Sequence, residues 1–128
     1  MTTWSQVQET MRSTYALEDD TPDMMSMVWS YDDGRSQKII IRKYAAFGRE
    51  MVEFKSPFAR KSDVDPLAML RKNSELPLAT IALSGDVYIV VYNAMLEHLH
   101  MGDFTLYVSR VAAVADTLEE KYAQRDDF

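Results

Sequence analysis

The chain contains no cysteine among its 128 residues, which excludes disulfide bonds, thiol nucleophiles and zinc sites built from thiolates. Glycine is scarce as well: each of the four residues stands alone at a predicted chain reversal, so the sequence has no glycine-rich loop to cradle a phosphate group. No apolar run approaches the roughly 20 residues that span a bilayer. The first residues lack the basic lead and apolar core of a signal peptide. We therefore expect a soluble, cytoplasmic protein.

Basic residues are in the minority. The 14 Lys and Arg residues are outnumbered by 20 Asp and Glu residues, which gives a formal charge of −6. This balance argues against a nucleic acid or an anionic membrane as the main partner. The hydrophobic fraction of 47% is ordinary for a globular protein, and the length suits one core, so we expect a single domain over residues 1–128.

The signatures of catalysis are absent from the sequence. No serine sits in a G-x-S-x-G elbow or an S-x-x-K motif. Paired acids at 19–20, 32–33 and 126–127 fall in predicted turns or in the tail, where adjacent carboxylates do not converge on a substrate. We predict a protein that is not an enzyme and needs no cofactor.

Apolar periodicity predicts an α+β fold in which a twisted antiparallel five-stranded sheet is packed by helices. Short connectors between the first three strands require antiparallel pairing, so these strands form a meander that ends at Ser56-Pro57. Thr3 or Ser5 is expected to cap the first helix, and Ser62 or Asp63 the second. The predicted order is α-β-β-β-α-β-β-α, with elements at 3–17, 23–31, 36–47, 50–56, 63–73, 78–83, 87–92 and from 103 onward.

Methionine is unusually frequent, with nine residues in the chain. Met fills irregular gaps in cores, but it also lines surfaces that bind varied peptides. We keep both interpretations open, and note that a sheet edge here would accept an extended peptide by strand addition. The candidate client-binding residues come from the first helix and the first predicted strand: Trp4, Met11, Met25, Met27 and Trp29.

A second apolar surface is predicted around the second helix and the last two strands. On the strand at 87–92, Tyr88 and Tyr92 share one face while Val87, Ile89 and Val91 share the other. A domain of this size has one core, so a partner subunit or the flanking helices must cover the second face. We expect a homodimer, with Leu67, Leu70, Tyr88 and Tyr92 at its interface.

His98 and His100 support an alternative function. On a strand extension, their spacing would place both rings on one face, where Glu97 or Asp103 could complete a metal site. Residues 96–102 are equally compatible with a loop, in which case the two histidines are simply exposed. The alternative function is thus a small-ligand or metal sensor, and a third is an adaptor for a folded partner.

The element order, Asn73 with the following LPLATIALSGDVYIVV, and the closing AVADTLEEKY resemble the YbjN and type III secretion chaperone-like family, with its Tir chaperone-like fold. The resemblance implies a small, acidic, often homodimeric cytoplasmic protein. Secretion chaperones of this family bind unfolded segments of client proteins, which wrap around the dimer in extended form. Pro77-Leu78 departs from the small residue that many relatives carry there. We predict a non-enzymatic protein- or peptide-binding module, chaperone-like or regulatory, that acts as a dimer.

Overall fold

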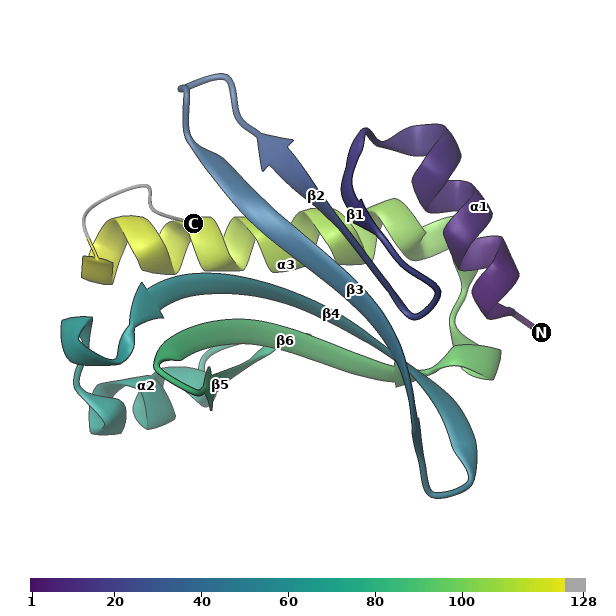
Figure 1. The fold of residues 1–128 in the computed structure, drawn as a ribbon. Coiled ribbons are helices and arrows are strands. Elements are labelled where there is room, and N and C mark those ends of the chain that lie inside the picture. The colour runs from purple at the N-terminus through teal and green to yellow at the C-terminus, as the bar shows by residue number, and fades with distance from the viewer. Residues whose placement is uncertain (124–128) are drawn as a thin grey trace.

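The computed structural model describes residues 1–123, which form one antiparallel sheet with helices packed against it (Figure 1). Short 3-10 turns at Lys61–Asp63, Leu96–His98 and Met101–Asp103 join the elements, and a π-helical turn at Glu119–Ala123 extends the last helix. The helices are α1 (Trp4–Thr14), α2 (Pro66–Asn73) and α3 (Phe104–Leu118). The strands are β1 (Leu17–Asp20), β2 (Met24–Ser30), β3 (Ser36–Ala46), β4 (Arg49–Arg60), β5 (Thr80–Ser84) and β6 (Val87–Met95).

The described sheet has six strands in the order β1-β2-β3-β4-β6-β5, so the prediction of five strands is wrong by one. The additional strand is the acidic segment Leu17–Asp20 after α1, which is not among the strands predicted from the sequence. It pairs with β2 through Leu17 opposite Met27 and Asp20 opposite Met25, with a bulge between them. Charge and a bulge on an edge strand discourage further pairing. The β2–β3–β4 meander and the β5–β6 hairpin are confirmed.

Strand β4 continues through Pro57 to Arg60, although Pro57 was expected to end it. Proline has no N–H, so it cannot donate to a neighbouring strand. The ladder to β3 has already ended at the Ile40–Lys55 pair, and side chains bridge the two strands beyond it. The Ser56 hydroxyl donates to the Lys38 carbonyl at 2.6 Å, and the buried Gln37 amide donates to the Pro57 carbonyl.

The starts of the first two helices are determined by local residues that account for the free backbone N–H groups of a helix N-terminus. At α1, the Thr3 hydroxyl accepts from the Gln6 N–H while the Gln6 side chain accepts from the Thr3 N–H, so the expected Thr3 cap is confirmed. At α2, Asp65 occupies the cap position and Pro66 the first turn. The caps proposed at Ser62 and Asp63 are therefore wrong.

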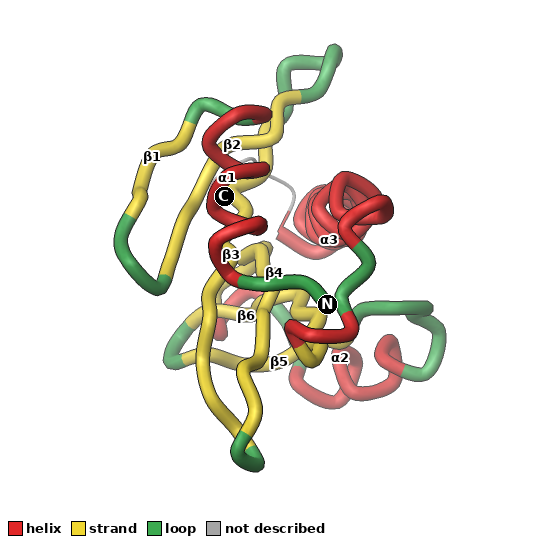
Figure 2. Tube along the Cα trace, turned by 90° about the vertical axis from the view of Figure 1, so that its right-hand side faces the viewer, coloured by secondary structure: helices red, strands yellow, loops and turns green. Residues whose placement is uncertain are grey.

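Helix α3 determines which face of the sheet is the core. It packs across β3, β4 and β6, and Figure 2 shows α3 and α2 on the same side of these strands. The fully buried Phe54 ring lies 5.6 Å from that of Phe104 and 5.8 Å from that of Tyr107, between ring centroids. The buried side chains of α1 join the same core cluster.

A buried ionic cluster attaches the end of α3 to the turn between β2 and β3. Arg35 Nε lies 2.9 Å from an Asp116 carboxylate oxygen, and an Arg35 terminal nitrogen lies 3.3 Å from Glu119, which is completely buried. Burial, together with the nearby Asp116 and Asp33 carboxylates, raises the pKa of Tyr31 to about 12. The phenol is neutral at physiological pH, as it would be at its ordinary pKa of 10, so it adds no charge to this cluster.

The β3–β4 hairpin ends in a turn with a conformational cost. Phe47 has a φ of 55° and Gly48 a φ of 71°, and the Phe47 side chain is fully exposed. Two consecutive positive φ values are typical of the type I′ turn that fits a twisted hairpin, and Asn-Gly is its preferred sequence. A β-carbon in this left-handed region costs roughly 1–2 kcal/mol.

We expect Phe47→Asn to stabilise the domain by about 1 kcal/mol, because Asn tolerates the left-handed conformation. The measurement is urea unfolding at equilibrium, with a higher midpoint and an unchanged slope. Phe47→Ala is the matched control, since it removes the exposed ring but keeps the strained β-carbon. An equal gain from both substitutions would show that the backbone is not the cause.

Candidate protein-binding surfaces

The five residues proposed from sequence as a client surface lie together, but mostly inside the protein. Trp4 is 7% exposed, Met27 is 4% exposed, and Met11 and Met25 are fully buried, while Trp29 is partly buried. They belong to or pack against one core cluster, where α1 meets β2. This position fits the interpretation of methionine as core filling.

Strand addition at the Met-rich strand is not available in this conformation. Strand β2 is not an edge, because β1 pairs along it on one side and β3 on the other. A bound segment would have to displace α1 to reach Met11 or Met25. The client-binding role of these five residues stays a prediction, and the accessible surfaces lie elsewhere.

The four residues proposed for a dimer interface separate into two pairs. Leu67 and Leu70, called here the α2 leucine pair, are 51% and 67% exposed. Tyr88 is buried and stacks on Phe58 with 6.0 Å between ring centroids, while Tyr92 stacks on Tyr107 at 5.2 Å. The alternation predicted for this strand is present, but its tyrosine side faces the helices. The uncovered side carries Val87, Ile89 and Val91 instead.

The far edge of the sheet, β5, is shielded by one side chain of α2. Asn73 Oδ1 accepts from the Ile81 N–H at 2.6 Å, and Asn73 Nδ2 donates to the Ile81 carbonyl at 3.2 Å. These are the two bonds that another strand would make at this position. The strand itself, TIALS, has no charge or proline to protect its edge. Asn73 is therefore the main described feature that closes this edge, and neither periodicity nor composition identified it.

The second face of the sheet, called here the open face, is not covered by any helix within residues 1–123 (Figures 1 and 2). Strand registers place Ile40, Lys55, Val91 and Thr80 in one row across four strands, with Ile89 in the next row. The apolar residues that the registers place on this face are Met24, Val28, Ile40, Ala46, Met51, Pro57, Ala82, Val87, Ile89, Val91 and Met95.

Charged groups on the open face are linked through Glu53. Arg42 contacts it with two nitrogens at 3.1 and 3.3 Å, and the Lys55 ammonium lies 3.3 Å from the same carboxylate. Burial alone raises the pKa of Glu53, but the hydrogen bond from Arg42 and the two positive charges outweigh it, so the pKa falls below its usual 4.5. The carboxylate is thus ionised at neutral pH and shared by two cations.

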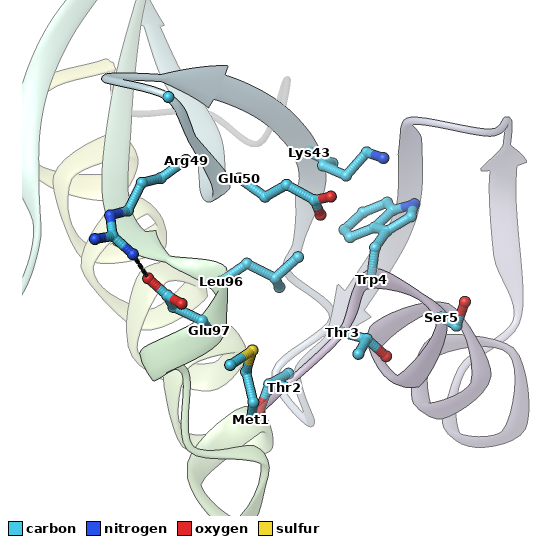
Figure 3. Close-up of a pocket in the computed structure, with 11 residues that line it drawn as sticks. Met1, Thr2, Thr3, Trp4, Ser5, Lys43, Arg49, Glu50, Leu96 and Glu97 are labelled. Atoms are coloured by element: carbon cyan, nitrogen blue, oxygen red, sulfur yellow. Dashed lines mark hydrogen bonds and ion pairs between the residues drawn. The ribbon is translucent and has the colours of Figure 1, made fainter.

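Figure 3 shows a pocket of about 520 Å³ where the start of α1 meets the β3–β4 hairpin. Lys43 and Glu50 lie beside Trp4, and Arg49 forms an ion pair with Glu97 on the opposite wall. Cations and carboxylates are equal in number among these residues, and no nucleophile is paired with a base. The pocket therefore gives no basis for a reaction or for selecting a charged ligand.

The histidines of the alternative sensor function lie near this pocket but do not assemble a metal site. Residues 96–98 and 101–103 form 3-10 turns, so the strand alternation that would align the two rings is absent. His98 and His100 are both exposed and line a second pocket of about 420 Å³. Within residues 1–123, no three His, Asp or Glu side chains converge as metal ligands. This arrangement favours the exposed-loop interpretation.

We expect Asn73→Ala to destabilise the domain by about 1–2 kcal/mol, because the Ile81 N–H and carbonyl lose their partners. The exposed edge should also make association depend on protein concentration, measured by light scattering. Asn93→Ala is the control, since Asn93 is exposed and accepts one bond from the Tyr44 hydroxyl. Equal stability and equal scattering for the two variants would contradict the shielding role.

None of the helices within residues 1–123 is both long and apolar enough to cross a membrane. No protein-family model and no curated protein matches the chain. Among solved structures, a chain from the crystal structure of the ExsC–ExsE complex is similar, with a TM-score of 0.62 over 94% of this chain and 96% of that chain. The two sequences are 9% identical, so the likeness concerns the fold. It supports the type III secretion chaperone-like fold that the sequence resembles, while the YbjN resemblance stays a prediction.

Proposed function

We propose that this protein is a non-enzymatic binding domain that receives an extended segment of another protein on the open face of its sheet. The observation that carries the proposal is the aliphatic row on that face. This row consists of Ile40, Pro57 and Ile89, which are partly exposed, and of Val91 between them, which is 7% exposed. The four residues lie across adjacent strands, and no described helix covers them. Apolar residues gathered on an uncovered face mark interaction sites in soluble proteins.

An extended segment suits this surface better than a small ligand. The aliphatic residues are spread over β3, β4, β6 and β5, and strands in a sheet lie about 4.8 Å apart, so the row is long and shallow. Small-molecule sites are usually concave and enclose their ligand. The fold likeness to a chain from a protein–protein complex agrees with a protein partner. Chaperone-like or regulatory capture of a client is the role that follows.

The proposal predicts that peptide binding depends on the aliphatic row. Panning a random-peptide display library on the wild type should enrich peptides that lose binding to the double variant Ile40→Ser, Ile89→Ser, because that variant removes apolar contact area. Thermal unfolding establishes that the variant is folded. Leu106→Ser is the control, since Leu106 is 45% exposed on α3, away from the open face.

Peptides that bind the wild type and the double variant equally would place the site elsewhere. A library that yields no specific binder would count against peptide binding altogether. Peptides lost only with Leu106→Ser would move the site to the helical side of the domain.

We further propose that the domain acts as a homodimer through the α2 leucine pair. Leu67 and Leu70 are one turn apart on α2, so they present one apolar ridge on a short surface helix. A second copy of the ridge would bury both, and isologous contacts of this kind are the commonest form of association. For Tyr88 and Tyr92 the interface role stays a prediction, and it would require both rings to leave the core.

The dimer proposal predicts a solution mass of about twice 14.7 kDa for the wild type and a single-chain mass for Leu67→Asp, Leu70→Asp. Charged residues at a contact of this kind would be buried without partners. The measurement is multi-angle light scattering after gel filtration, with Leu106→Asp as the control. A wild type that elutes at single-chain mass, or a leucine variant that still dimerises, would rule out this interface.

A further inference from the structure

The open face has a net positive charge, although the chain as a whole has a net negative charge. Strand registers place two carboxylates on it, Asp19 and Glu53, and a third, Glu97, pairs with Arg49 from the end of β6. With Glu97 counted, and also Asp63, whose carboxylate accepts from the Arg60 N–H at 2.8 Å, this face carries a net charge of +1, whereas the whole chain carries −6. The basic side chains that the same registers place there are Lys38, Arg42, Arg49, Lys55 and Arg60.

The cations are interleaved with the aliphatic row. Lys55 lies in register between Ile40 on β3 and Val91 on β6, and Lys38 lies opposite Val28 on β2. At the centre, Arg42 and Lys55 share the single carboxylate of Glu53. Two cations around one carboxylate leave a local excess of positive charge next to an apolar surface.

Resting on the function proposed above, we infer that the open face selects acidic segments that also carry aliphatic side chains. Aliphatic residues of the segment contact the row formed by Ile40, Ile89 and Val91. A carboxylate of the segment lies beside Glu53, between Arg42 and Lys55. The two positive charges are then balanced by two negative charges. Charge complementarity of this kind contributes mainly to partner choice and association rate.

Nucleic acid is the other polyanion that a basic sheet face can bind, and the aromatic content of this face argues against it. Bases bind open sheets by stacking on exposed aromatic rings. Tyr44 is the one aromatic residue that the described strands place here. Its ring is covered by the Arg42 guanidinium at 4.5 Å, and its hydroxyl donates to Asn93 at 2.6 Å. Aliphatic side chains suit a polypeptide instead.

The charge distribution also argues against a second copy of this chain on the same face. Two open faces would bring together two surfaces of equal positive charge, and like charges in contact disfavour association. The two side chains of the α2 leucine pair are themselves uncharged. The dimer contact and the segment contact therefore use different parts of the domain.

The test is the charge of the peptides that panning enriches. On the wild type, we expect the enriched peptides to be acidic as well as aliphatic. On the charge-reversed variant Lys38→Glu, Lys55→Glu, we expect neutral or basic peptides. Arg110→Glu, Lys121→Glu is the matched control, because it makes the same total change at exposed positions on the helical side. Thermal unfolding establishes that both variants are folded.

A representative enriched peptide is then followed by fluorescence anisotropy as salt rises from about 50 mM to about 500 mM. We expect the affinity of the wild type to fall about fivefold or more, because screening weakens contacts between partly exposed charges. The control variant should follow the wild type, and the charge-reversed variant should lose the salt dependence for this peptide.

The outcomes separate the two proposals. Peptides that depend on Ile40 and Ile89 but show no charge preference would overturn the inference and leave the proposed function standing. A library in which no binder depends on the aliphatic row would overturn both. A single-stranded RNA oligonucleotide that binds the wild type more tightly than the acidic peptides would overturn the inference and identify a nucleic acid surface.

Discussion

The packing of α3 against the face of the sheet centred on Phe54 is the contact on which the rest of the structure depends. Three aromatic rings from β6 and α3 surround Phe54, and this contact determines which side chains of β3, β4 and β6 enter the core. Side chains alternate along a strand, so the choice of one face assigns every remaining residue to the other. The open face is thus a direct consequence of where α3 lies.

The two edges of the sheet are protected against further strand pairing in different ways. The edge at β1 is acidic and bulged, and Asp20 there also pairs with Arg12 of α1 at 2.8 Å. The edge at β5 has neither charge nor bulge, and its backbone is closed by Asn73 from α2. Helix α2 therefore has two functions in the fold: Met69 contributes to the core, and Asn73 substitutes for a neighbouring strand.

Elements whose stabilising contacts are local could be predicted from the sequence, and those that depend on distant contacts could not. The cap at Thr3, the meander and the β5–β6 hairpin follow from neighbouring residues. Strand β1 could not be predicted, because three of its four residues are acidic and it forms only through pairing with β2. The extension of β4 past Pro57 depends on pairing with the distant strand β6, where Pro57 lies opposite Ile89 and Arg60 opposite Val87.

The candidate site could be predicted only in part, because its local pattern is visible in the sequence but the distant contacts that decide burial are not. Alternation on β6 correctly separated the tyrosines from Val87, Ile89 and Val91, but only the position of α3 shows which set faces the helices. Composition could not distinguish a core methionine from a surface one, because the side chain suits both places. Leu67 and Leu70 could be recognised as exposed candidates, since α2 is short and apolar over much of its length.

Charge is partitioned over the fold so that an acidic chain has one basic sheet face, which is the face proposed to receive acidic segments. Acidic residues predominate overall, and a net negative charge opposes non-specific association. Basic residues are concentrated on the open face, where Glu53 lies between Arg42 and Lys55 and offsets part of their charge. Like charge discourages two copies from meeting through this face, and the proposed self-association at α2 would leave it accessible. A dimer built this way would present two open faces, and one long segment could engage both, which raises affinity through effective concentration without any new contact.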